Sequence, residues 1–133
     1  MLSDGLVSTG SIPVASGTFA DVWRGTYPPS SVVAIKALRI YNNDELRTVQ
    51  KVCFQGFHEQ LADDVGYHQQ LFKEVVVWRR LSHPNVLPFL GITATVFRLG
   101  VVSEWMPNGH IGQYLTSNPS TNRLPLASPT SFI

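Results

Sequence analysis

The chain has 133 residues, of which 44% are hydrophobic and 14% charged, and ten Lys and Arg against nine Asp and Glu give a net charge of +1. This length and apolar content suit one small globular domain. A nearly neutral balance argues against a nucleic-acid partner or a membrane-surface partner, so we expect neither.

The cellular compartment is suggested by the cysteine count and by the first residues of the chain. Cys53 is the only cysteine, so a disulfide framework within the chain is excluded and a reducing compartment is expected. The N-terminal residues lack the charged and apolar blocks of a signal peptide, and no apolar run approaches the roughly 20 residues of a membrane span. We therefore expect a cytoplasmic or nuclear protein.

Residues 12–25 predict a strand, a turn and a second strand, with Ser16 and Gly17 in the turn. An ordinary hairpin is the simpler interpretation of this pattern. The alternative is a flap whose backbone N–H groups lie over phosphates, because small residues let the main chain approach an anion.

The next predicted strand spans residues 32–40 and carries Lys36 in a β-branched apolar run. Alternation places Lys36 on the same face as Val32 and Ala34. Such a lysine either protects an edge strand and reaches water, or points at an anion in a cleft. The strand alone leaves both interpretations open.

A helical insert is predicted after this strand. Capping residues at 42–44 favour a short helix that ends before Gly56. Residues 54–70 show no sustained period, and we assign them no conformation. His58 and His68 lie there without other metal ligands nearby in sequence, so we interpret them as solvated side chains and predict no metal site.

The strongest helical pattern covers residues 71–81, where apolar side chains that include Val75 and Trp78 recur along one stripe. Glu74 lies on or beside this stripe, so we expect its carboxylate to point inward. A buried carboxylate needs a cation, and Lys36 is the candidate. On a helix that stands alone, a surface glutamate is the simpler interpretation.

Residues 86–93 and 99–104 predict two more apolar strands, and a chain reversal at 105–109 precedes a brief helix from Ile111. Residues 116–133 are rich in Ser, Thr, Asn and Pro, which predicts a disordered tail. Together the elements predict an α+β fold with a five-stranded antiparallel sheet and one main helix.

In this order the motifs resemble the N-terminal, ATP-binding lobe of a eukaryotic protein kinase of the serine/threonine or tyrosine-kinase-like type. The resemblance covers about residues 10–115, with the insert at about 54–70. The motifs are a Gly-rich loop at 14–22, a Val-Ala-Ile-Lys strand ending at Lys36, the helix residue Glu74, His-Pro-Asn at 83–85, and a hinge-like segment at 102–106.

The resemblance implies a role for each of these residues. Lys36 would hold the α- and β-phosphates of ATP and pair with Glu74, the two making up the catalytic set. Val22 and Ala34 would press on the adenine, the backbones of Glu104 and Met106 would hydrogen-bond its edge, and Ser103 would be the gatekeeper. Trp78 and Phe89 would lie in the apolar column that links the helix to the catalytic half of the family's domain. The full cofactor-binding set is Val14, Ala15, Gly17, Val22, Ala34, Lys36, Ser103, Glu104 and Met106.

The chain also departs from the family pattern. Of the three loop glycines only Gly17 is present, since Ala15 and Ala20 replace the others, and each added methyl group restricts the backbone. No histidine is followed by Arg-Asp and no aspartate by Phe-Gly. The catalytic base and the Mg²⁺ ligands that the parent family uses are thus missing, and we expect this chain alone to be inactive.

Several functional interpretations follow from these motifs. The first is the ATP-binding lobe of a kinase whose parent reaction transfers the ATP γ-phosphate to a Ser, Thr or Tyr hydroxyl of a protein substrate. The second is a non-catalytic, pseudokinase-like module that occupies a partner kinase or a regulator. The third is a β-sheet interaction domain unrelated to kinases. We also expect that the reading frame is incomplete or mis-spliced.

Overall fold

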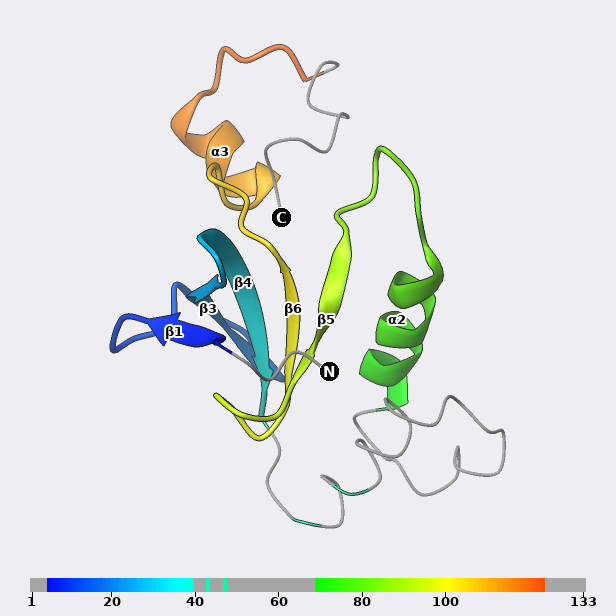
Figure 1. The fold of residues 1–133 in the computed structure, drawn as a ribbon. Helices are drawn as coiled ribbons and strands as arrows, with labels where there is room; N and C mark the ends of the chain where they lie inside the picture. Colours follow the sequence, from blue (N-terminus) through cyan, green and yellow to red (C-terminus); the bar gives the residue numbers. More distant parts are fainter. Residues whose placement is uncertain (1–4, 40–42, 44–46, 48–68, 124–133) are drawn as a thin grey trace.

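The computed structural model describes residues 5–39, 43, 47 and 69–123 (Figure 1). Asn43 and Arg47 are helical, and the rest of the predicted insert up to residue 68 lies outside the described residues. The elements in chain order are β1 (Val7–Thr9), β2 (Ala15–Ser16), β3 (Ala20–Tyr27), β4 (Ser31–Leu38), α2 (Gln69–Arg80), β5 (Phe89–Thr93), β6 (Gly100–Glu104) and α3 (Ile111–Ser117).

The strands form one antiparallel sheet in the order β1-β3-β4-β6-β5, with β2 also paired to β3. The α+β prediction is confirmed, although the sheet has six strands instead of five. The additional strand is β1, whose Val7 and Thr9 pair with Thr26 and Arg24. Because β2 pairs only with the beginning of β3, β1 occupies the rest of the same edge.

One face of the sheet carries the main apolar cluster. Ile35 on β4 lies opposite Trp23 on β3 and Val102 on β6, so the register gathers large side chains on this face. The Trp23 ring meets Phe97 at a centroid distance of 5.3 Å. Five of the eight residues of β4 are buried, as expected for a strand that lies between two others in the sheet. The position of Lys36 is therefore fixed by a well-packed strand.

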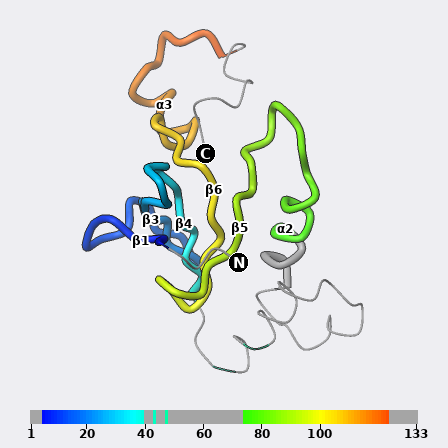
Figure 2. Tube along the Cα trace, viewed as in Figure 1, coloured from blue at the N-terminus to red at the C-terminus, as the bar shows by residue number. Residues whose placement is uncertain are grey.

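Helix α2 lies beside β5 at the edge of the sheet (Figures 1 and 2). Its bounds agree with the predicted helix at 71–81, and Val75 is buried. The Trp78 indole N–H donates to the Leu87 carbonyl at 2.5 Å, and the Trp78 ring meets Phe89 edge-on at 5.7 Å. The C-terminal half of α2 is thus attached to the start of β5 by a hydrogen bond and an aromatic contact.

Helix α3 follows the sheet and begins at a histidine cap. The Gln113 backbone N–H donates to His110 Nδ1 at 3.2 Å, which satisfies one of the free amides of the first turn. Because α3 ends at Ser117, the first residues of the segment predicted to be disordered are helical. Residues 124–133 lie outside the described residues. Within the described part, no helix is both long and apolar enough to cross a bilayer.

Candidate nucleotide site

The face of the sheet opposite the Trp23 cluster brings together four predicted site residues. Val22 is the cross-strand partner of Lys36, and Ala34 is the partner of Ser103. Ala34 and Ser103 are buried, at 4% and 5% exposure, whereas the Lys36 side chain is exposed. The face therefore offers a floor of small side chains with an ammonium group beside it. Such a surface suits a flat ligand with an anionic portion.

The predicted flap is the short hairpin formed by β2 and the start of β3. The Val14 N–H donates to the Val22 carbonyl at 2.8 Å, and the Gly17 N–H donates to the Ala20 carbonyl at 2.9 Å. Ala15 and Ala20 lie in strands, and no described residue other than glycine has a positive φ. The alanines that replace two loop glycines thus introduce no backbone strain in the flap.

The predicted hinge begins where β6 leaves the sheet. The Trp105 N–H donates to the Val32 carbonyl at 3.2 Å, so the backbone groups of Glu104 point away from β4. The register of β5 reaches only Ser103, one residue short of Glu104. The carbonyl of Glu104 is thus directed to an edge where no described strand pairs with it, and there it accepts a long hydrogen bond, of 3.4 Å, from the Ser103 hydroxyl.

Met106 completes this edge. Its side chain is buried, and its carbonyl accepts a hydrogen bond from the Gly109 N–H at 3.2 Å, which closes the predicted turn. Gly109 has a φ of 65°, a conformation that glycine adopts without strain. The Met106 N–H has no partner among the described residues. A backbone acceptor at Glu104 and a backbone donor at Met106 are therefore both available to a ligand.

The structure does not bring Lys36 and Glu74 together. Both side chains are exposed, and among the described residues no ion pair within 4 Å joins them. The prediction that the Glu74 carboxylate points inward is wrong, because α2 turns Val75 and Trp78 toward its neighbours and leaves Glu74 in solvent. An exposed ion pair contributes only about 0–1 kcal/mol, which is too little to hold a helix in place.

The sequence reasoning missed an ion pair at the base of the flap. Arg39, just after β4, donates to both carboxylate oxygens of Asp21, at 2.6 and 3.1 Å. The Ser16 hydroxyl also donates to Asp21, at 2.6 Å. The Arg39 guanidinium and the Ser16 hydroxyl lower the pKa of Asp21 from 3.8 to about 2. Only the pairing of β3 with β4 brings these residues close, and no local sequence pattern indicates it.

A second missed contact links β3 to the hinge. The Arg24 guanidinium lies over the Trp105 ring, 5.4 Å from its centroid. Arg24 pairs with Ala34, so it belongs to the same face as the predicted adenine floor. This cation–π contact connects the outer part of that face to the segment that follows Glu104.

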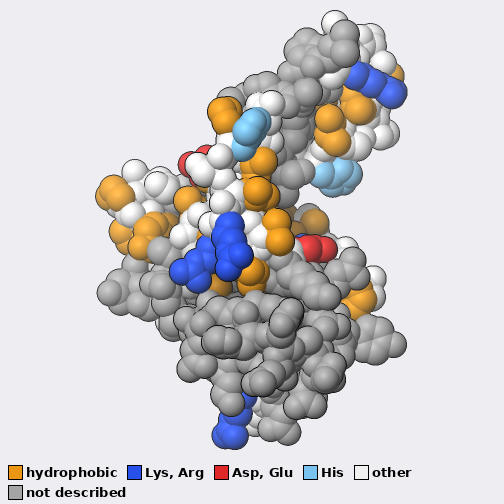
Figure 3. Space-filling model, turned by 90° about the vertical axis from the view of Figure 1, so that its right-hand side faces the viewer, with side chains coloured by type: hydrophobic (Ala, Val, Ile, Leu, Met, Phe, Trp, Pro, Cys, Tyr) orange, Lys and Arg blue, Asp and Glu red, His pale blue; other side chains and the backbone are white. Residues whose placement is uncertain are grey.

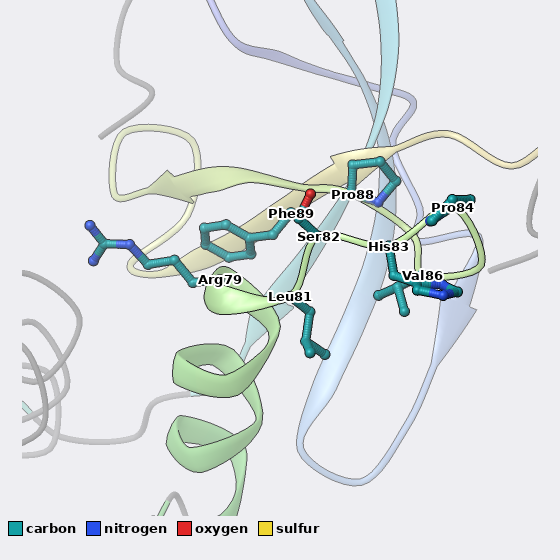
Figure 4. A pocket seen from close by; sticks show the side chains of 8 residues that line it. All are labelled: Arg79, Leu81, Ser82, His83, Pro84, Val86, Pro88 and Phe89. Carbon is teal, nitrogen blue, oxygen red and sulfur yellow. The ribbon is translucent and has the colours of Figure 1, made fainter.

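A separate cavity of about 440 Å³ lies between the end of α2 and the start of β5 (Figure 4). Arg79 and Phe89 lie at one end of the cavity, and His83 and Val86 at the other. Its lining contains no residue of the predicted nucleotide set.

Hydrophobic and basic side chains adjoin one another on the face seen in Figure 3. In the part of the chain that the structure describes, no group of three potential ligands could hold a metal ion.

Comparison with known proteins identifies the family. Residues 11–132 match the family model for protein tyrosine and serine/threonine kinases. The chain is 30% identical to the serine/threonine-protein kinase STY46 of Arabidopsis thaliana over 112 residues, which are 84% of this chain and 16% of that protein. It is 34% identical to the L-type lectin-domain containing receptor kinase I.3 of the same plant over 109 residues, 80% of this chain and 13% of that protein.

The match to a human relative covers fewer residues, but the sequence identity within it is higher. The dual specificity testis-specific protein kinase 2 of Homo sapiens is 40% identical over 60 residues, which are 43% of this chain and 10% of that protein. The chain belongs to the protein kinase family, and its sheet and helices correspond to a kinase N-terminal lobe. It spans about a sixth or less of the length of these curated relatives.

Proposed function

We propose that this chain forms the ATP-binding lobe of a protein kinase, whose parent reaction transfers the ATP γ-phosphate to a protein hydroxyl. The observation that carries the proposal is the shared face of β3, β4 and β6. On this face the small side chains of Ala34 and Ser103 lie next to the cation of Lys36. The backbone groups at Glu104 and Met106 are available at the adjoining edge.

In this proposal each part of the nucleotide meets a group that suits it. The adenine lies against Val22 and Ala34, and its polar edge accepts from the Met106 N–H and donates to the Glu104 carbonyl. The Lys36 ammonium makes charge-assisted hydrogen bonds to the phosphates, which are the stronger kind. The flap residues Ala15 and Gly17 are small, so the backbone of the hairpin can approach the phosphates.

Phosphoryl transfer is not proposed for this chain alone. Protein kinases position the reaction with Mg²⁺ and a catalytic aspartate, and most of the rate enhancement depends on these groups. The 133 residues contain neither a His-Arg-Asp nor an Asp-Phe-Gly sequence, and the described residues provide no metal-binding group. We therefore assign nucleotide binding to this chain and derive no catalytic step from it.

The alternative is a non-catalytic, pseudokinase-like module that binds a partner kinase or regulator. The separation of Lys36 from Glu74 favours this function, because an active kinase lobe needs the two to pair. In that case the surface that contacts the partner would matter, and nucleotide would have little effect on stability.

The proposal is tested by measuring Kd for ATP, with and without Mg²⁺, by calorimetry on the wild type and Lys36→Met. A hydrogen bond to a charged group contributes about 1.5–3 kcal/mol, so binding should weaken about tenfold to a hundredfold. Arg98→Gln is the matched control, since this exposed residue follows Phe97, which packs on the opposite face. Equal affinity of wild type and Lys36→Met would contradict the proposed site.

The same measurement separates the two functions. ATP binding that depends on Lys36 supports the nucleotide-binding lobe. If the wild type neither binds ATP nor shifts its melting temperature with ATP and Mg²⁺, the proposed function is overturned and the non-catalytic module is favoured.

A further inference from the structure

The base of the flap is held by three residues from three consecutive elements, which we call the flap clamp: Ser16 on β2, Asp21 on β3 and Arg39 after β4. Arg39 binds Asp21 through two nitrogens, Nε and Nη2, and such two-point contacts fix orientation as well as distance. The Ser16 hydroxyl shares the Oδ1 atom of Asp21 with Arg39 Nη2. The side chains therefore join both strands of the flap to the end of β4.

A backbone hydrogen bond reinforces the same connection. The Arg39 N–H donates to the Phe19 carbonyl at 2.9 Å, so Arg39 holds the returning end of the flap as well as the Asp21 carboxylate. The adjacent pair, Ala20 with Leu38, is the first pair of the long β3–β4 register. Lys36 lies two residues before Leu38 on the same face of β4. Arg39 of the clamp thus directly follows the strand that carries the proposed phosphate-binding lysine.

The flap itself is too small to be ordered without such help. Strand β2 contributes only two residue pairs, and a two-stranded hairpin is marginally stable in water. Phe19 is 48% exposed, so the tip buries little apolar surface. The contacts at Asp21 and Arg39 lie where the hairpin joins the main sheet, and there they restrict how far the tip can swing from the sheet face.

We propose that Asp21 and Arg39 are positioning residues that hold the flap over the phosphate end of the nucleotide site, an inference that rests on the proposed ATP site. Asp21 alternates with Val22 along β3, so its side chain lies on the face opposite Lys36. The clamp therefore does not touch the nucleotide and acts on it only through the position of the flap.

Loss of the clamp should therefore lower the affinity for ligands that carry phosphates more than for ligands that do not. Loss of Asp21 frees the flap and weakens ATP binding, whereas adenosine, which has no phosphates, is unaffected. Loss of Arg39 frees the flap in the same way, so the weakening for ATP is similar to that with Asp21→Asn. A purely structural role would instead change the affinity for both ligands to a similar extent.

The test uses the full 133-residue chain as the wild type, Asp21→Asn, Arg39→Gln and the exchanged double variant Asp21→Arg with Arg39→Asp. Arg98→Gln is the control for lost surface charge. Hydrogen exchange of the Gly17 amide, which donates within the flap, is measured without nucleotide, and Kd is measured for ATP and for adenosine. Far-UV circular dichroism and thermal melting establish that each variant is folded.

We expect at least threefold faster exchange of the Gly17 amide in Asp21→Asn and Arg39→Gln, with wild-type exchange in Arg98→Gln and partial recovery in the exchanged variant. We also expect the ratio of the ATP Kd to the adenosine Kd to rise threefold or more in both Asp21→Asn and Arg39→Gln. Unchanged exchange in both single variants would overturn the clamp.

The exchange measurement needs no nucleotide, so it separates this inference from the proposed function. If the wild type binds ATP and Asp21→Asn alters neither exchange nor the ratio, the clamp is refuted and the ATP site stands. Faster exchange in the variants of a chain that does not bind ATP would refute the nucleotide role of the clamp together with the proposed function.

Discussion

The attachment of α2 to the sheet depends on Trp78, and its contribution can be separated into two parts. Trp78→Phe keeps an aromatic ring that can meet Phe89 but removes the indole N–H that donates to the Leu87 carbonyl. Trp78→Ala removes both contacts. Comparing the two variants therefore measures the hydrogen bond and the ring contact separately.

The magnitudes follow from the type of contact. A net hydrogen bond contributes about 1 kcal/mol, so Trp78→Phe should lower the free energy of unfolding by about that amount. An aromatic pair contributes about 0.5–1.5 kcal/mol beyond its buried area, and the lost area adds to this. We therefore expect Trp78→Ala to lower the stability by about 2–3 kcal/mol in total.

Urea denaturation followed by far-UV circular dichroism provides the measurement, because fluorescence would be altered by the loss of an indole. Hydrogen exchange along α2 shows whether the loss is local to the helix. Val77→Ala is the matched control, since Val77 is on the same helix and 56% exposed, and a change within about 0.5 kcal/mol is expected there. Wild-type stability of Trp78→Ala would refute the reasoning.

Three further outcomes are expected. Gly25→Ala should lower stability by about 1–3 kcal/mol in urea denaturation, because its methyl group would lie 2.8 Å from Ile35 Cδ1, and a neutral result would contradict this packing. Gly17→Ala, whose methyl group would lie 3.5 Å from its nearest neighbour, should leave stability unchanged, and a large loss would refute the described flap. The hydrogen bonds from Arg39 and Ser16 lower the pKa of Asp21 from 3.8 to about 2. The contribution of the ionised Asp21 to the stability of the fold is therefore complete above about pH 4 and is lost as the pH falls toward 2. Asp21→Asn should remove that component from an acid titration, and an unchanged titration would contradict it.

The local elements were predictable because each depends on a short pattern of side chains. Alternation along residues 32–40 identified the strand of Lys36, and the helical stripe through Val75 identified α2. The small residues of the flap and the turn before Gly109 were read from turn chemistry. Strand β1 was not predicted, because three residues carry too little pattern and its pairing with β3 depends on which edge β2 leaves open.

The candidate site was predictable only as far as it depends on alternation. The positions of Ala34 and Lys36 on one face follow from the strand itself, and the register with β6 adds Ser103 to them. The roles of the individual site residues remain predictions. The proximity of Asp21 to Arg39 could not be predicted from the sequence, because the register of two paired strands decides which charged side chains meet.

The sequence by itself determined the order of the elements, the apolar character of β4 and the placement of a lysine beside small side chains. Only the tertiary structure decided that Glu74 faces solvent, that Trp78 attaches α2 to β5 and that Asp21 pairs with Arg39. The physical reason is that alternation and helical period act between near neighbours in the chain. The placement of a helix against a sheet depends on packing between distant residues, and a surface ion pair is too weak to impose it.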